Sequence, residues 1–523
     1  MTKTKENSNI IAVITMIFLF GMISFVTNLA APIGNIWKMQ PGIDGSNTLG
    51  MMGNMMNFLA YAIMGIPAGA LLKKKGYKFT AEAALLVGLL GVFVQFLSGV
   101  LFKGALIGKI PASFIVYLLG AFICGFSVCM LNTVVNPMLK ILGGKRSNQY
   151  IQIGGSFNSL MGTLTPMLVG AMIGTLTKDT LISDVNTLLF MAMGVFAVAF
   201  VILLFVPIQN PEAQKVEGQV ENPMKYLHFV LGAIAIFVYV GVEVGIPGTL
   251  NFYLSDSSAK GAGLDPAFAA KIAGVIAGVY WLLMLVGRLT SSVISGKVSS
   301  KTQLTCVSSV ALLLLIAAII IPKSATVKMN IAVDVEDQVE AVAEMPACCQ
   351  AEAKLACCEA QNAEGVAEGE MPAECCAEGE KPAECCEAEK ACQEGEACDK
   401  PCCEDKAACD KHCEEAAAAA PVSTHKEKVP ANIPVAAILL VLCGLCTSVM
   451  WGTIFDLSVE GLGTATEKAS GIFMAMVVGG GILPLIQNFV ADKAGYMTSY
   501  WVLVLGVAFI LYFAIIGSKV KKN

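Results

Sequence analysis

Charged side chains are scarce in this chain: only 14% of its 523 residues are Asp, Glu, Lys or Arg, whereas 56% are hydrophobic. A water-soluble core cannot hide that much apolar surface, so a soluble enzyme is excluded. Histidine is scarcer still, and none of His228, His412 and His425 stands with a nucleophile in a triad-like pattern. The sequence therefore predicts neither an enzyme nor a bound cofactor.

The charges that are present are distributed unevenly. Residues 323–430 hold 25 of the 40 acidic residues but only 10 of the 35 basic ones. Elsewhere Lys and Arg are scattered over short loops, whereas a nucleic-acid-binding protein gathers them in one stripe or patch. We therefore expect no nucleic acid as a partner, and we treat 323–430 as a separate insert.

Long apolar runs fill most of the chain outside the insert, and the mean hydropathy is +0.69. A helix needs about 20 apolar residues to cross a bilayer, and windows of about 19 residues locate such helices. The first run follows Lys3 and Lys5 as a secretory signal would, but it is too long for one and eleven more follow. We predict twelve spans: 10–36, 50–72, 82–102, 112–139, 151–174, 187–207, 227–253, 268–294, 303–322, 434–456, 468–491 and 498–517.

The placement of Lys and Arg predicts the orientation of these spans, because short cytoplasmic loops are enriched in both residues. With the N-terminus inside, inward segments hold 18 of them and short outward loops hold 7. We therefore expect both termini in the cytoplasm and the insert 323–430 on the periplasmic or extracellular side of the cytoplasmic (inner) membrane.

The two groups of six spans echo each other. Cys124-Gly125 and Cys443-Gly444 open similar stretches, and Tyr61 and Tyr280 precede Gly-containing segments. Parallel repeats of this kind occur in secondary transporters. The predicted fold is an all-α integral membrane protein whose twelve transmembrane helices form two six-helix halves. The parts are a first half 1–207, a cytoplasmic linker 208–226, a second half 227–322 with 431–523, and the insert 323–430.

Five stretches carry a family resemblance. They are TSVMWGTIFDLSVEGLGTATEKASGIFMAMVVGGGILPLIQNFVADKAG (447–495), LNTVVNPMLKILGG (131–144), SFNS (156–159), YVGVEVGIPGTLNFYL (239–254) and YWLLMLVGR (280–288). Together they resemble the fucose permease and glucose/galactose permease group of sugar:proton symporters in the major facilitator superfamily. The resemblance covers all twelve spans and omits the insert. It implies alternating access, with a monosaccharide bound near the bilayer midplane.

The chain departs from the fucose permease pattern at two positions. That pattern has an acidic residue in the first span, where this chain has Thr27-Asn28 ahead of Pro32. It has another before T-x-x-N-P in the fourth span, where this chain has Asn132. An amide does not titrate, so neither position can carry a proton here.

Ionisable groups inside a span are costly and are usually retained for a transport pathway or a buried partner. Glu243 lies deep in the seventh predicted span, flanked by Val242 and Val244. We expect it to bind the coupled proton, to bind sugar, or to do both. The alternative is a buried carboxylate held by hydrogen bonds to a neighbouring helix.

Sugar hydroxyls both donate and accept hydrogen bonds, so a sugar site needs amide and carboxylate groups together with an aromatic face. The alternatives are that the amides join helices and that the tryptophan anchors the chain at the membrane interface. The candidate sugar-binding residues are Asn28, Asn132, Asn136, Gln152, Asn158, Glu243, Asn251, Trp451 and Gln487.

Charged residues at span ends are candidates for cytoplasmic gates, as the superfamily resemblance implies for the loops after the second and eighth spans. The candidates are Lys75, Glu82, Arg288 and Asp456, with Glu82 as a partner for Arg288 or for the Lys73-Lys74-Lys75 run. The alternative is that these charges only follow the positive-inside rule. Gly154-Gly155 and Gly479-Gly480-Gly481 are expected to allow close helix packing.

The insert holds 14 of the 19 cysteines, many in near-repeats such as MPAECCAEGE and KPAECCEAEK. Its Ala, Glu, Cys and Lys content cannot bury enough apolar surface to fold alone. Three hypotheses stay open: a low-complexity insertion dispensable for transport, a metal or redox sensor, and a disulfide-linked partner-binding segment. The possible metal-binding thiolates are Cys348, Cys349, Cys375, Cys376, Cys385 and Cys386.

The leading hypothesis is a monomeric carrier in the lipid bilayer that imports a hexose or deoxyhexose of the glucose, galactose or fucose class. Its coupling ion is expected to be a proton, with sodium coupling or no coupling as the alternatives. A second hypothesis is a membrane sensor that keeps the transporter fold and detects metals or redox state through the insert. A third is the efflux of another small polar solute.

Overall fold

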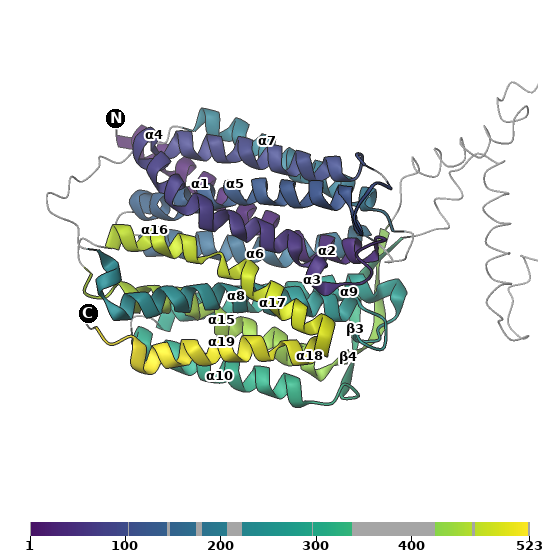
Figure 1. Cartoon of the computed structure of the whole chain (residues 1–523). Helices are drawn as coiled ribbons and strands as arrows, with labels where there is room; N and C mark the ends of the chain where they lie inside the picture. The colour runs from purple at the N-terminus through teal and green to yellow at the C-terminus, as the bar shows by residue number, and fades with distance from the viewer. Residues whose placement is uncertain are drawn as a thin grey trace, which may run out of the picture. The chain divides into compact units, whose positions relative to one another are not determined.

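The computed structural model describes residues 2–102, 104–143, 147–173, 180–206, 222–294, 297–336, 424–462 and 466–520 (Figure 1). The chain divides into two units, Met1–Ile331 with Pro430–Asn523 and Ala332–Val429. The first unit contains the helices, which are α1 (Thr2–Asn28), α2 (Ala30–Met39), α3 (Asn47–Gly50), α4 (Met52–Ser98), α5 (Ala112–Gly143), α6 (Ser147–Ile173), α7 (Asn186–Phe205), α8 (Leu227–Ser255), α9 (Pro266–Ile294), α10 (Ser300–Ile320), α15 (Val435–Val459), α16 (Thr466–Met476), α17 (Gly479–Ala494), α18 (Tyr496–Ser499) and α19 (Trp501–Tyr512). Shorter turns are η2 (Ile182–Val185), η3 (Pro223–Lys225) and η6 (Phe513–Gly517).

Ten helical stretches among the described residues are long and apolar enough to cross a membrane. Each predicted span overlaps at least one helix, but several do not match a single helix. The span predicted at 10–36 is divided between α1 and α2, and the span at 468–491 between α16 and α17. The spans predicted at 50–72 and 82–102 both lie within α4, which is kinked at Gly76, where φ is 84°. The span predicted at 151–174 lies on α6, which is not among the ten apolar stretches.

Apolar side chains cover much of the outer surface of these helices. Phe205, Leu505 and Ile66 are 82%, 72% and 71% exposed. A helix that is hydrophobic on its outer side as well as its inner side is typical of a membrane span. The exposed side chains therefore indicate the faces that contact lipid.

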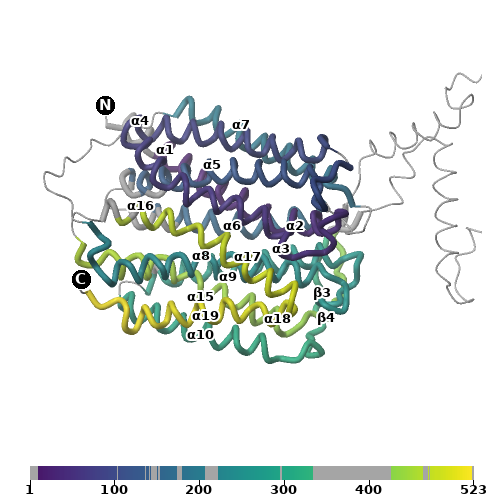
Figure 2. The backbone as a smooth tube through the Cα atoms, in the orientation of Figure 1, coloured from purple at the N-terminus to yellow at the C-terminus, as the bar shows by residue number. Residues whose placement is uncertain are grey.

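Segments far apart in the sequence lie side by side in the first unit. Figure 2 shows the C-terminal α17 running beside α8, and α6 packs along α9. Gly479 allows α17 to approach α8 closely, because a Cβ there would overlap the carbonyl oxygen of Phe237 on α8. Gly481 faces the backbone of Met55 on α4, 3.0 Å from where its Cβ would stand. The predicted role of this glycine run in close helix packing is confirmed.

Two small sheets complete the described structure. β1 (Leu106–Ile107) and β2 (Ile110–Pro111) form an antiparallel hairpin between α4 and α5. β3 (Thr326–Glu336) and β4 (Thr424–Pro434) form a second two-stranded sheet at the two ends of the insert. β3 lies within the predicted insert 323–430 and β4 crosses its C-terminal boundary, so both ends of the insert contain β-strand. The six cysteines proposed as thiolate ligands lie outside the described residues.

Candidate functional site

A cavity of about 1050 Å³ lies among the helices of the first unit. Side chains from α1, α4, α5 and α6 line it together with others from α8, α9, α10, α15 and α16. It runs from Thr27 and Trp281 to Ser300 and Asp456, which lie at the ends of α10 and α15 that the sequence assigns to the cytoplasm. This volume lies near the upper limit of the range typical of small-molecule sites.

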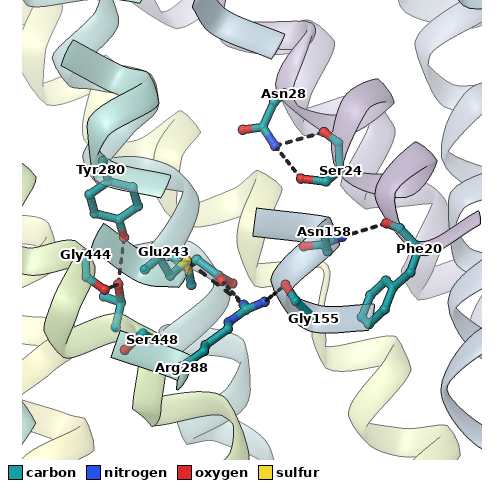
Figure 3. Close-up of polar contacts among 12 residues, drawn as sticks. Phe20, Ser24, Asn28, Gly155, Asn158, Glu243, Tyr280, Arg288, Gly444 and Ser448 are labelled. Carbon is teal, nitrogen blue, oxygen red and sulfur yellow. Dashed lines mark hydrogen bonds and ion pairs between the residues drawn. The ribbon is translucent and has the colours of Figure 1, made fainter. Parts of the chain in front are cut away.

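A carboxylate and a guanidinium face each other in this cavity. The Nη2 atom of Arg288 on α9 lies 3.4 Å from Oε1 of Glu243 on α8, and the two side chains are 19% and 13% exposed. The Nη1 atom of Arg288 donates to the carbonyl oxygen of Gly155 on α6 at 3.1 Å (Figure 3). Glu243 is therefore paired, and its partner also contacts a helix from the other end of the sequence.

Three asparagines line the same cavity, and their amide nitrogens contact neighbouring groups. Asn28 Nδ2 donates to the Ser24 carbonyl oxygen at 2.9 Å, and Asn158 Nδ2 donates to the Phe20 carbonyl oxygen at 2.8 Å (Figure 3). Asn132 Nδ2 contacts the Tyr61 hydroxyl at 2.6 Å. In Figure 3 the carbonyl oxygen of Asn28 points away from Ser24, toward the helices that carry Tyr280 and Glu243.

Two of these polar residues stand four positions before a proline. Pro32 follows Asn28 at this spacing and Pro247 follows Glu243. Proline has no amide hydrogen, so it cannot complete the helical hydrogen bond to the carbonyl four residues earlier. The helix is interrupted just after Asn28, between α1 and α2. The prolines thus place irregular or weakened backbone at the cavity, which is where membrane proteins tolerate it.

Aromatic rings supply apolar faces to the cavity. Trp451 lines it and packs against Tyr239, with 6.0 Å between ring centroids. Tyr61 stacks on Phe58 at 5.8 Å, and Trp281 also lines the cavity. No site role was predicted for Tyr61, Tyr239 or Trp281 from the sequence, although each lies in or near a family-like or repeated stretch.

A second, small pocket of about 30 Å³ adjoins the large cavity. Thr27, Asn28, Val244 and Trp281 line both spaces. The small pocket adds Asn251, a predicted sugar-binding residue, and its other walls come mainly from α2, α4 and α8.

The other predicted sugar-binding residues are not brought to these spaces. Gln487 is fully buried on α17, and its Oε1 atom lies 2.6 Å from where a Cβ on Gly245 would stand. It lines neither the cavity nor the small pocket. The side chains of Asn136 and Gln152 lie outside the described residues.

The four residues predicted as gates do not gather in one place. Arg288 and Asp456 line the large cavity, where Asp456 accepts a hydrogen bond from Ser300 at 2.6 Å. Lys75 lies over the Phe79 ring at 5.7 Å. Glu82 forms an ion pair with Lys78 at 3.9 Å rather than with Arg288 or the lysine run, because Lys78 precedes it by one helical turn.

At the opposite end from Ser300 and Asp456, the helices α2 and α3 contact α8, α17 and α18. Lys38 is only 6% exposed, and its Nζ atom donates to Asn47 at 2.6 Å and to the Tyr496 hydroxyl at 3.2 Å. The Tyr496 hydroxyl in turn donates to Asp256 at 3.1 Å. We call Lys38, Asn47, Asp256 and Tyr496 the Lys38 cluster.

Two further contacts join the same helices. Asp492 on α17 accepts hydrogen bonds from the backbone nitrogens of Asn47 and Thr48 at 2.7 and 2.9 Å. Asn35 on α2 donates to Asn251 on α8 at 2.7 Å, and both are buried. The end of the bundle opposite Asp456 is therefore closed by buried polar contacts.

Apolar helices around a polar cavity are typical of a membrane carrier. Residues 11–333 match the family model of the Major Facilitator Superfamily, and the chain belongs to this superfamily of transporters rather than to an enzyme family. It is accordingly a multi-pass membrane protein. It is similar to the glucose/galactose transporter of Brucella abortus, with 24% identity over 96% of this chain and 92% of that protein.

Further relatives are also named as sugar transporters. A putative glucose/galactose transporter of Helicobacter pylori is 23% identical over the full length of both chains. The L-fucose-proton symporter of Escherichia coli is 34% identical over 87 residues, which is 16% of this chain and 20% of that protein. Among solved structures, FucP in the outward conformation has a TM-score of 0.55 and 16% identity, and covers 97% of this chain and 98% of its own. A D-xylose-proton symporter has a TM-score of 0.58 and 11% identity, and covers 98% and 100%. These structural similarities establish the fold.

Proposed function

We propose that the protein is a secondary active transporter that imports a hexose or deoxyhexose across the cytoplasmic membrane. The observation that carries this proposal is the cavity itself, in which amides from four helices, two carboxylates and several aromatic rings line a common space. This is the set of groups that a ring of hydroxyls requires. The relatives that match over nearly the whole chain are named as glucose/galactose transporters, which supports the proposal.

Alternating access is the proposed mechanism, carried out by twelve membrane helices in two six-helix halves. In this arrangement α4 supplies two spans on either side of Gly76, and α6 supplies a span as well. The Lys38–Tyr496 bond and the Asp492 contacts then join the two halves at the outer end while the cavity extends to Asp456 at the inner end. We propose an inward-facing state for this arrangement, with both termini in the cytoplasm and the insert outside, as the loop charges predict.

Proton coupling is proposed to pass through Glu243. Among the described residues that line the cavity, Glu243 and Asp456 are the acidic ones, and Asp456 is exposed at the inner end of the cavity. Glu243 is enclosed and has a cationic partner, so loss and gain of its proton change the charge balance at the site. The fucose and xylose carriers with this fold are named as proton symporters, which supports the choice of ion.

The substitution Glu243→Gln tests this function, because it keeps the size and hydrogen-bonding capacity of the side chain and removes its charge. We expect exchange of labelled glucose across the membrane to persist and accumulation against a gradient to be lost. Glu460→Gln is the matched control, since Glu460 is exposed at the end of α15. Wild-type accumulation that resists a protonophore, together with normal accumulation by Glu243→Gln, would reject proton coupling. Replacement of sodium would then distinguish a sodium-coupled carrier from a facilitator, and failure to transport any sugar would favour the sensor hypothesis.

A further inference from the structure

The small pocket beside the large cavity has dimensions that restrict what can enter it. Its volume is about 30 Å³. One water molecule needs at least roughly 10–15 Å³ by this kind of measure, so the pocket accepts a group of one or two non-hydrogen atoms and no sugar ring. Thr27, Asn28, Val244 and Trp281 line both spaces, so the small pocket lies directly beside the large cavity.

The pocket is polar on one side. Asn54 uses its Nδ2 atom to donate to the Gly480 carbonyl oxygen at 2.8 Å, and Asn251 uses its Oδ1 atom to accept from Asn35 at 2.7 Å. Asn28 uses its Nδ2 atom toward Ser24. In the described part of the chain these bonds leave the Oδ1 atoms of Asn28 and Asn54 as acceptors and the Nδ2 atom of Asn251 as a donor. One hydroxyl group both donates and accepts, so it matches this set.

The remaining walls are apolar and confine the occupant. Met51, Ala31 and Gly248 line the pocket, together with prolines from α2, α6 and α8. A methylene group packs against such walls, and a terminal hydroxyl beyond it faces the amides. Trp281 stands at the junction of the two spaces, where its ring can pack against the C–H face of a sugar.

We propose that the small pocket is a subsite for the exocyclic hydroxymethyl group of a hexose whose ring lies in the large cavity. This inference rests on the proposed function, and it narrows the substrate class to hexoses that carry a hydroxyl on carbon 6. A 6-deoxyhexose places a methyl group among the amides and leaves them without a partner. A pentose leaves the pocket without any sugar group.

The preference follows from the cost of leaving buried polar groups unpaired. The loss of one such hydrogen bond is equivalent to about a tenfold change in affinity. We expect the wild-type protein to favour glucose over 6-deoxyglucose by about tenfold. We expect Asn28→Ala to reduce this ratio to about threefold or less, because it removes one of the acceptors and opens the pocket to water.

Gly248→Ala tests the subsite by size alone, because it removes no polar group. Its new Cβ would lie 3.1 Å from Met51 Cε and 3.9 Å from Ala31 Cβ, and all three residues line the pocket. We expect the affinity for glucose to fall about tenfold while the affinity for xylose, which has no carbon 6, changes less than about threefold. Gly194→Ala is the matched control, since nothing lies within 4 Å of its new Cβ and α7 does not line the pocket.

The experiment measures competition by glucose, 6-deoxyglucose and xylose for labelled-sugar uptake in cells that produce each full-length variant at a verified membrane level. A glucose-selective loss in Gly248→Ala, with Gly194→Ala unchanged, supports the subsite. Equal affinities of the wild type for glucose and 6-deoxyglucose, or an equal loss for all three sugars in Gly248→Ala, would overturn the subsite and leave sugar transport standing. A wild type that transports no sugar would overturn the proposed function and the subsite with it.

Discussion

Arg288 holds Glu243 and the opposite wall of the cavity at the same time. Its Nη2 atom lies 3.4 Å from Glu243 Oε1, and its Nη1 atom donates to the Gly155 carbonyl oxygen on α6 at 3.1 Å. Among the described residues Glu243 is the ion-pair partner of Arg288, so a change in its charge acts on a side chain that joins α9 to α6. Under the proposed function, this connection links the protonation of Glu243 to the packing of the helices around the cavity.

The pairing predicts how stability responds to charge removal. Arg288→Gln leaves the Glu243 carboxylate enclosed without its cation, and Glu243→Gln leaves the guanidinium without its anion. Breaking a buried pair in this way costs about 3 kcal/mol, whereas removing both charges costs less. We expect each single variant to lower the Tm in detergent and the double variant Glu243→Gln/Arg288→Gln to regain part of the loss.

The control for this cycle is Lys78→Gln with Glu82→Gln, because that ion pair is 3.9 Å long and its side chains are 32% and 22% exposed. A more exposed pair contributes about 0–1 kcal/mol, so we expect little coupling there. Additive losses at Glu243 and Arg288 would show that the two side chains do not stabilise each other in the membrane protein.

The sequence predicted the helices well because the bilayer fixes their length and composition. It also located Asn28, Asn132, Asn158, Glu243 and Trp451, which line the cavity, since polar or aromatic groups inside a span stand out against an apolar background. Gln487 met the same criterion and yet is buried beside Gly245. Both faces of a membrane helix are apolar, so periodicity does not reveal which face is turned to the cavity.

Other features depend on tertiary contacts that no local pattern encodes. Arg288 lies where the sequence suggested a cytoplasmic gate, but its long side chain reaches Glu243 on another helix. Lys38 is one of the seven basic residues that the sequence assigned to short outward loops. In the structure it is buried between α3 and α18. The small pocket arises where α1, α2, α4, α6, α8 and α9 meet, and its residues are spread from Thr27 to Trp281.

Deletion of residues 330–425 is expected to leave sugar uptake above about half of its wild-type rate. The Val435 backbone nitrogen donates to the Ala325 carbonyl oxygen at 2.9 Å, so the membrane ends of β3 and β4 are adjacent. A short turn can therefore replace the insert without moving α10 or α15, because closing a short loop costs little entropy. Uptake is measured at matched surface levels, and complete loss of uptake by a correctly inserted deletion protein would assign the insert a part in transport.

The orientation of the chain is tested on the insert. We expect Cys375 to react with a membrane-impermeant thiol reagent in intact cells after mild reduction and permeabilisation of any outer barrier, because the loop charges place 323–430 outside. A single-cysteine variant that keeps Cys375 removes the signal from the other thiols, and the same variant with Cys375→Ser serves as the control. Labelling that requires cell lysis would reverse the predicted topology.

The Lys38 cluster is expected to set the balance between inward-facing and outward-facing states. Lys38→Met keeps the length and apolar contacts of the side chain but removes its bonds to Asn47 and Tyr496. The bond to Tyr496 joins α2 to α18 and exists only while these helices lie against each other, so its loss weakens the closed outer end. A charge-assisted bond contributes about 1.5–3 kcal/mol, which shifts a two-state equilibrium about 10- to 100-fold.

We expect Lys38→Met to increase the rate at which a cysteine placed at Ser255 is labelled from outside the cell. Ser255 lies at the closed outer end of the bundle and accepts a hydrogen bond from Asn35 at 3.1 Å. The measurement uses a background without the other reactive cysteines and an impermeant thiol reagent. Lys493→Met is the control, since Lys493 is exposed on the neighbouring α17. Because Lys38→Met leaves the inner end of the cavity intact, sugar binding from inside should weaken only through the lower population of the inward-facing state. If Ser255→Cys is labelled at the same rate with Lys38→Met as with the native Lys38, then Asp492 and Asn35 close the outer end without the bonds of Lys38.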